Sequence, residues 1–115
     1  MKPKTPLERD IKRQIMIETS KRVVWFNNPV GLAKDGKRKI KYGCGGKGAS
    51  DLLGILRDGS GRFVACETKR PGKKATKEQI RFIELVLRAG AIGFVASSVE
   101  GVNRELDSQG GIEPI

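Results

Sequence analysis

The chain has 115 residues, of which 23 are Lys or Arg, 13 are Asp or Glu and none is histidine, so its net charge is +10 at pH 7. A chain of this length predicts one domain with a single hydrophobic core of modest size. The lack of histidine excludes Ser-His-Asp triads, Cys-His proteases and metal sites that depend on imidazole. Acid–base chemistry would therefore rest on carboxylates, lysine, tyrosine or metal-bound water.

The positive charge is concentrated in two stretches. Residues 1–50 carry 13 basic and 4 acidic side chains, residues 69–81 carry 6 and 1, and residues 82–115 carry 2 and 5. Separate basic stretches are typical of a surface that binds a polyanion, and a merely soluble basic surface is the alternative. A membrane-surface helix is disfavoured, because no basic helix predicted here has a strongly apolar opposite face.

Cysteine usage and hydropathy predict a cytoplasmic protein. Cys44 and Cys66 lie 22 positions apart with no CxxC motif, which favours two reduced thiols over a zinc cluster or a redox pair. Cys66 lies in an apolar run and is predicted to be a small core residue. The N-terminal segment lacks the apolar stretch of a signal peptide, and no window approaches the roughly 18 apolar residues of a membrane-spanning helix.

The first half of the chain predicts a helix, a strand and a long loop. The sequence TPLE at 5–8 matches a capping box, and apolar residues recur on one face after it, so we expect a helix over about 6–20. The β-branched and aromatic run 22–26 predicts a short buried strand. Residues 29–50 are rich in Gly, Lys and Arg and are predicted as a long basic loop, with a short extended piece at 39–42.

The middle of the chain predicts a β-hairpin. The apolar runs 51–56 and 62–69 are separated by the sequence DGSG at 58–61, which is strong turn chemistry. With the turn centred near residue 59 or 60, antiparallel partners have numbers that sum to about 118 to 120.

The remaining sequence predicts a helix, a strand and a last helix. A second capping box at 76–79 starts a helix that stops at Gly90. A buried strand follows over 91–96, and a short helix starts at Ser97, with an irregular tail from Ser108. The predicted order αβββαβα is that of a single α/β domain whose central mixed sheet is flanked by helices.

Three polar residues at the ends of these apolar strands are the candidates for chemistry. Side chains alternate along a strand, so Glu67 and Lys69 share a face. The hairpin register places Asp51 opposite Glu67, Thr68 or Lys69, and a sum of 118 or 120 puts the side chains of Asp51, Glu67 and Lys69 on one face. Two carboxylates beside an ammonium suit Mg²⁺, which takes oxygen ligands and activates water for attack on phosphate. The alternative is a surface salt bridge at a strand end, which contributes only about 0–1 kcal/mol.

Two longer segments resemble a known family. GASDLLGIL at 48–56 and RFVACETKRPGKKATKEQIRFIELVLRAGAIGFVASSVE at 62–100 resemble the viral-type replication and repair nuclease domain (VRR-NUC) of the PD-(D/E)XK nuclease superfamily. The superfamily's acid, spacer and Glu-x-Lys pattern matches Asp51, Glu67 and Lys69. The resemblance covers about residues 7–106 and implies a restriction-endonuclease-like core.

The resemblance also implies further site residues and a Mg²⁺ or Mn²⁺ cofactor. Glu8 matches a glutamate that joins the metal site, with the first capping box as its equally supported alternative. The backbone carbonyl of Thr68 is implied as a metal ligand. Gln79 matches a glutamine near the site, with the second capping box as its alternative. Asn28 is implied as a substrate contact, with a turn role as its alternative.

Basic residues beside these positions are the expected DNA contacts, namely Lys47, Arg70, Lys73 and Lys74. The segment 43–48 matches GxGxxG, but it precedes a strand and lacks a βαβ context, so a dinucleotide site is not predicted. It is predicted instead as a flexible loop whose backbone can approach phosphates.

These observations predict a metal-dependent DNA endonuclease that hydrolyses phosphodiester bonds in the cytoplasm of a bacterial or phage-infected cell. The resemblance implies a homodimer, and two sites would suit branched DNA such as a four-way junction in DNA repair. With no room for a separate DNA-binding module, we expect the domain itself to bind DNA. The alternative is a non-catalytic nucleic-acid-binding protein of the same fold; RNA binding is disfavoured because few aromatics are available for stacking.

Overall fold

The computed structural model of the chain describes residues 5–110. In this range three helices and six strands follow one another in the order α1 (Glu8–Glu18), β1 (Val23–Asn27), β2 (Gly31–Asp35), β3 (Arg38–Tyr42), β4 (Leu52–Leu56), β5 (Phe63–Thr68), α2 (Lys77–Arg88), β6 (Ile92–Ala96) and α3 (Val99–Gly110). Without β2 and β3, this is the predicted αβββαβα order, and the α/β class is confirmed.

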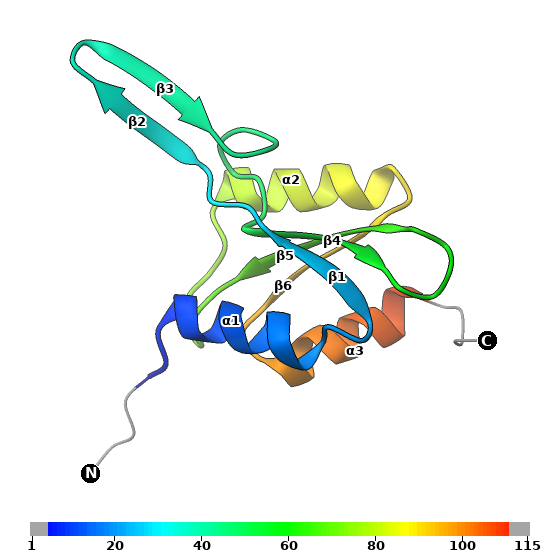
Figure 1. The fold of residues 1–115 in the computed structure, drawn as a ribbon. Helices are drawn as coiled ribbons and strands as arrows, with labels where there is room; N and C mark the ends of the chain where they lie inside the picture. The colour runs from blue at the N-terminus through cyan, green and yellow to red at the C-terminus, as the bar shows by residue number, and fades with distance from the viewer. Residues whose placement is uncertain (1–4, 111–115) are drawn as a thin grey trace.

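The main sheet has four strands in the order β1-β4-β5-β6. β1 pairs with β4 and β4 with β5 in antiparallel fashion, whereas β5 and β6 are parallel. Figure 1 shows α2 on one side of this sheet and α1 and α3 on the other. The parallel pair is joined through α2, as a crossover connection requires. The predicted mixed sheet with flanking helices is therefore present.

The hydrophobic core lies between the sheet and the pair α1 and α3. Its helical members come from the apolar faces that helical spacing predicts, and its strand members are the inward-facing residues of all four strands. The buried cluster comprises Ile11, Ile15, Val23, Leu52, Leu56, Val64, Cys66, Ile92, Phe94, Ala96, Val102 and Leu106. Cys66 is therefore a core residue, as its apolar run predicts.

Helix α1 begins two residues later than predicted, and the first capping box does not form. Leu7, in extended conformation, is the N-cap residue, and no side chain caps the helix. Glu8 is thus the first helical residue instead of the third, so its side chain cannot reach back to cap the helix in the predicted way. Its carboxylate is left available for a tertiary contact.

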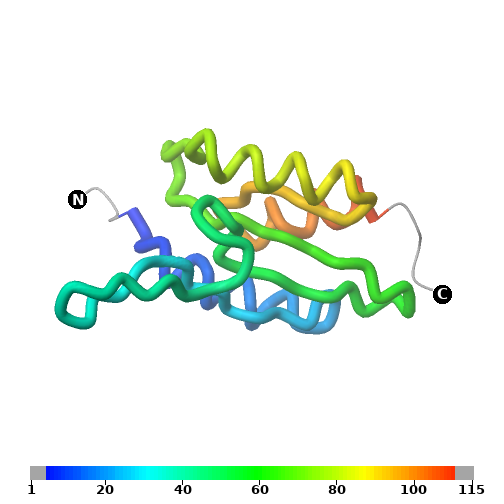
Figure 2. Tube along the Cα trace, turned by 90° about the horizontal axis from the view of Figure 1, so that it is seen from above, coloured from blue at the N-terminus to red at the C-terminus, as the bar shows by residue number. Residues whose placement is uncertain are grey.

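The prediction of a loop over 29–50 is wrong for residues 31–42, although the short extended piece expected at 39–42 is confirmed as part of β3. β2 and β3 form an antiparallel hairpin in which Asp35 pairs with Arg38. Gly36 has φ +61°, and no non-glycine residue between positions 5 and 110 has positive φ, which fits a type II′ turn with glycine in the first position. Figures 1 and 2 show the hairpin projecting away from the main sheet.

Helix α3 is longer than predicted and includes residues 108–110, which were expected to be irregular. The side-chain amide of Gln109 accepts a hydrogen bond from Gly93 N over 3.0 Å and donates one to Gly93 O over 2.9 Å. It thereby occupies the open edge of β6, which would otherwise expose unpaired backbone groups. The expected tail beyond residue 110 lies outside the described residues.

No helix within residues 5–110 combines the length and apolar character needed to cross a bilayer.

Candidate metal centre

The hairpin register brings two of the predicted acids together. Leu52 pairs with Cys66, so partner numbers sum to 118, and one further step places Asp51 opposite Glu67. The backbone N–H of Asp51 donates to Glu67 Oε2 over 3.3 Å. The predicted proximity of these acids at one end of the hairpin is confirmed.

A third carboxylate joins them from α1. One carboxylate oxygen from each of Glu8, Asp51 and Glu67 lies within 4.8 Å of the other two. Glu67 is buried, with 3% of its surface exposed, while Glu8 and Asp51 are half-buried. The structure thus places Glu8 at the cluster that the resemblance implies. Three oxygen donors converging on one point suit a hard divalent cation.

Thr68 orients the carboxylate of Asp51. The Thr68 N–H donates to Asp51 Oδ1 over 3.0 Å, and the Thr68 hydroxyl donates to Asp51 Oδ2. An ionised carboxylate offers about four acceptor positions, so both oxygens keep lone pairs for a further ligand. The implied role of the Thr68 carbonyl as a metal ligand stays a prediction.

Gln79 combines the two roles that the sequence left as alternatives. Its Nε2 donates to Glu67 Oε1 over 2.9 Å. Its Oε1 accepts from Thr76 N over 2.8 Å, and its backbone N–H donates to the Thr76 hydroxyl over 3.2 Å, which completes the capping box. One side chain therefore starts α2 and holds the buried carboxylate.

The electrostatics of the cluster favour a bound cation. Burial and the negative charges of Asp51 and, to a smaller extent, Glu8 raise the pKa of Glu67 from 4.5 to about 7, against the opposing influence of Lys69. Among residues 5–110, the ion pairs within 4.0 Å are Arg22–Asp107 and Arg38–Asp35, so none of the three acids has a basic partner at that distance. A divalent ion would relieve this repulsion.

Lys69 lies near the cluster without pairing with it. Its backbone N–H donates to Ala96 O over 3.0 Å, and its side chain is half-buried. Its positive charge lowers the pKa of Glu67, which places the ammonium within electrostatic reach. Its predicted role in positioning water is untested.

A cavity of about 690 Å³ opens at the cluster. Its walls come from the base of the β2–β3 hairpin, the following glycine-rich loop, two of the three acids (Asp51 and Glu67) and the start of α2. The lining residues are Asn28, Val30, Gly31, Leu32, Lys41, Tyr42, Gly43, Gly46, Lys47, Gly48, Ala49, Asp51, Glu67 and Gln79. Lys47, a predicted DNA contact, lines this cavity, whereas Lys41 and Tyr42 were missed because the extended piece expected at 39–42 gave no sign that it lies beside the acids.

Asn28 positions the glycine-rich loop. Its side-chain amide donates to Cys44 O and Ser50 O over 3.0 Å each, and its Oδ1 accepts from Cys44 N over 2.8 Å. The residue is buried, and both amide hydrogens are used within the protein. Its implied contact with substrate stays a prediction. These bonds give Asn28 a structural role that differs from the expected turn role, because its partners are 16 and 22 positions away in sequence.

The other predicted DNA contacts follow β5. Lys73 and Lys74 are exposed, and Arg70 is half-buried. Lys73 N donates to Arg70 O over 3.0 Å, which closes a turn. These residues do not line the 690 Å³ cavity but lie in the connection between Glu67 and α2.

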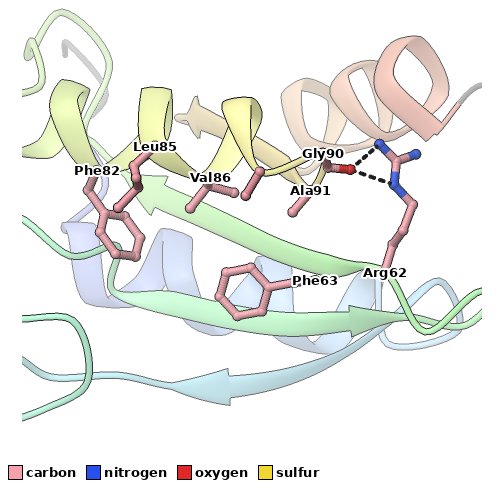
Figure 3. Close-up of a pocket in the computed structure, with 8 residues that line it drawn as sticks. Arg62, Phe63, Phe82, Leu85, Val86, Gly90 and Ala91 are labelled. Atoms are coloured by element: carbon pink, nitrogen blue, oxygen red, sulfur yellow. Dashed lines mark hydrogen bonds between the residues drawn. The ribbon is translucent and has the colours of Figure 1, made fainter.

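A second cavity, of about 570 Å³, lies between β5 and α2. Figure 3 shows its lining of apolar side chains, including Phe63, Phe82 and Leu85, with Arg62 at one end. The Arg62 guanidinium donates to Gly90 O over 3.1 and 3.3 Å. This cavity contains no carboxylate, so it adds no acid–base chemistry.

No protein-family model matches the chain, and no curated protein aligns with it significantly.

Proposed function

We propose that this protein is a Mg²⁺- or Mn²⁺-dependent DNA endonuclease. The observation that carries the proposal is the convergence of three carboxylate oxygens within 4.8 Å around the buried side chain of Glu67. The adjoining cavity also contains Lys41 and Lys47, so acidic and basic groups meet at one opening. Metal-dependent phosphodiester hydrolysis needs both, because a cation must be held while a polyanion is bound.

The donor set fits a hard divalent cation. Glu8, Asp51 and Glu67 would hold it, and the Thr68 carbonyl is the proposed fourth donor. When bound, such an ion polarises a phosphate oxygen and lowers the pKa of a water molecule. The hydrogen bonds from Thr68 to Asp51 fix one carboxylate, so less reorganisation is needed when the ion binds.

The other residues of the site would act on substrate and water. Gln79 holds Glu67 Oε1 over 2.9 Å and so orients the second oxygen of that carboxylate. Lys69 would position the attacking water or offset negative charge that develops on the phosphate. Lys47, together with the basic connection after β5, would bind the DNA backbone.

The family assignment and the assembly are part of the same proposal. The order of the main sheet and its helices supports a restriction-endonuclease-like, VRR-NUC-like core. We infer a homodimer that acts on branched DNA, because one compact site cuts one strand. Exposed apolar side chains, among them Phe26, Ile55 and Phe63 on β1, β4 and β5, provide surface for a partner subunit. Light scattering at micromolar concentration tests the dimer, and a strictly monomeric active protein would contradict it.

The test of activity is single-turnover cleavage of linear, flap, splayed and four-way DNA with Mg²⁺, Mn²⁺ or EDTA. We expect cleavage with either metal and none with EDTA. Glu67→Gln should reduce the rate by about 100-fold or more, whereas Glu100→Gln, which changes an exposed glutamate of α3, should not. Retained DNA binding with no metal-dependent cleavage on any substrate would favour the non-catalytic alternative.

A further inference from the structure

We propose that the β2–β3 hairpin is a phosphate-binding arm that holds a double-stranded segment of DNA through Lys34, Lys39 and Lys41. This inference deepens the proposed function and rests on it for the position of the cleaved bond. It arises from the register of the hairpin, the charge on each of its faces and the cavity at its base.

The register sorts the hairpin into two unlike faces. Directly paired residues of an antiparallel ribbon share a face. The pairs Lys34–Lys39 and Leu32–Lys41 therefore lie on one face, which we call the lysine face. The other face carries the pairs Gly31–Tyr42, Ala33–Ile40 and Asp35–Arg38.

Only the second face is neutralised. There the Arg38 guanidinium lies 3.2 Å from Asp35 Oδ2. The lysine face has three ammonium groups, no acid, and no ion pair among the described residues. Lys34 and Lys39 are opposite each other and exposed, and like charges in this position destabilise a ribbon. A bound polyanion would attract both ammonium groups and so offset their repulsion.

The lysine face is continuous with the acidic cluster. Leu32 and Lys41, the pair at the base of this face, line the 690 Å³ cavity together with Asp51 and Glu67. The Lys34–Lys39 pair lies two residues further out, about 7 Å along the strands. Figure 1 shows the hairpin standing away from the main sheet. A DNA backbone bound along these lysines would therefore extend from the carboxylate cluster towards the tip of the hairpin.

The chemistry of the face favours double-stranded DNA. Single-strand sites stack successive bases on aromatic side chains, whereas the lysine face has no aromatic residue and the cavity at its base is lined by one, Tyr42, which belongs to the other face. Lysine can also contact guanine edges, but the lysine face lacks the Asn and Gln side chains that read adenine, so we expect it to bind mainly phosphates. Three lysines suit the duplex backbone, which carries one charge per about 1.7 Å of axis. The contact would be independent of sequence.

The test measures metal-free binding, so it does not depend on cleavage. A labelled duplex of mixed sequence and its single strand are titrated by fluorescence anisotropy in EDTA at several salt concentrations. The variant Lys34→Gln/Lys39→Gln/Lys41→Gln should bind the duplex more than about tenfold less tightly at low salt. Its slope of log affinity against log salt should fall by up to about 2.7, since each phosphate contact contributes about 0.9.

Two matched variants complete the design. The control variant Lys21→Gln/Arg88→Gln/Arg104→Gln removes the same charge from three exposed positions outside the hairpin and the cavity. It should change the slope by less than about 0.9, the contribution of one phosphate contact. Replacing the three hairpin lysines with arginine should preserve both affinity and slope. Circular dichroism on each variant verifies folding.

Four results would overturn the hairpin proposal. These are normal duplex binding by the hairpin variant, an equal loss in the remote triple variant, an equal loss of single-strand and duplex affinity, and a reduced molecular mass in light scattering, which would assign the hairpin to contacts between copies. The proposed function fails separately, if Glu67→Gln cuts DNA at the parent rate. A hairpin variant that binds duplex normally while Glu67→Gln is inactive would remove this inference alone.

Discussion

Gln79 links the start of a helix to the buried acid of the candidate centre. Its Nε2 donates to Glu67 Oε1 over 2.9 Å, and its Oε1 accepts from Thr76 N over 2.8 Å. Rotation of this amide would break both bonds at once, so the capping box fixes the donor that faces the carboxylate. The local start of α2 and the orientation of Glu67 are therefore coupled.

This coupling predicts different outcomes for the two capping residues. Thr76→Ala removes the hydroxyl that caps α2 but keeps the Thr76 backbone N–H that holds Gln79 Oε1, so the free energy of unfolding should fall by about 1 kcal/mol while cleavage stays within a few-fold. Gln79→Ala should cost similar stability and also reduce metal affinity or cleavage by about 10- to 100-fold, as loss of an outer-shell partner does. Urea unfolding and single-turnover cleavage measure the two effects. Equal cleavage by both variants would contradict the coupling.

The raised pKa of Glu67 predicts that the metal-free protein loses stability as pH rises. The folded protein retains a proton on Glu67 up to about pH 7, whereas the unfolded chain releases it near the ordinary value of 4.5. Between these values the folded state binds more protons, so the free energy of unfolding should fall with pH, by at most about 1.4 kcal/mol per unit. Glu67→Gln should flatten this dependence in urea titrations performed in EDTA.

Mg²⁺ or Mn²⁺ should oppose this loss, because the ion binds the deprotonated carboxylates. The increase in melting temperature caused by the metal should therefore be larger at pH 8 than at pH 5. Glu67→Gln should reduce the increase at pH 8, whereas Glu100→Gln should retain it. A metal effect that is the same at both pH values, and in both variants, would argue against binding at this cluster.

Glu8 should act on the metal and not on the helix. No side chain caps α1, so Glu8→Gln should lower the free energy of unfolding only by the roughly 0.3–1 kcal/mol that a charge contributes at a helix N-terminus. It should weaken metal binding, since it removes one of three converging carboxylates. Isothermal titration with Mn²⁺ measures this, with Asp10→Asn in the same helical turn as the control. Unchanged Mn²⁺ affinity would exclude Glu8 from the site.

Several positions of the glycine-rich loop should not tolerate a side chain, and Gly48 is the one that lies against α2. A Cβ at Gly48 would lie 2.6 Å from backbone atoms of Glu78, and Gly48 has φ +91°. Gly46 has φ +75° with nothing within 4 Å of its Cβ position. Gly46→Ala should therefore cost about 1 kcal/mol from backbone strain. Gly48→Ala should cost more and also weaken metal-free DNA binding, because the loop would move away from α2.

Denaturant unfolding and anisotropy on the two glycine variants measure these effects side by side. Equal destabilisation with equal DNA affinity would show that the packing of the loop against α2 is not required for DNA binding.

Short-range sequence patterns predicted the elements for which the apolar runs and the turn residues indicate the same structure. Short runs of β-branched, aromatic and other apolar residues indicated the strands of the main sheet, and the turn at 58–61 limited the hairpin register to values that bring Asp51 close to Glu67. The capping box at 76–79 was visible because its partners are three residues apart. In each case the determining interactions are short-range along the chain.

The tertiary structure decided the features whose partners are distant in sequence. β2 and β3 are exposed on both faces, so no hydrophobic pattern marked them, although Asp35-Gly36 was a usable turn signal. The last turn of α3 depends on a pairing between Gln109 and Gly93, which are 16 residues apart. Glu8 matched a local cap and a metal site equally well in sequence. Only the packing of α1 against the sheet placed its carboxylate beside two others from strands more than forty residues away.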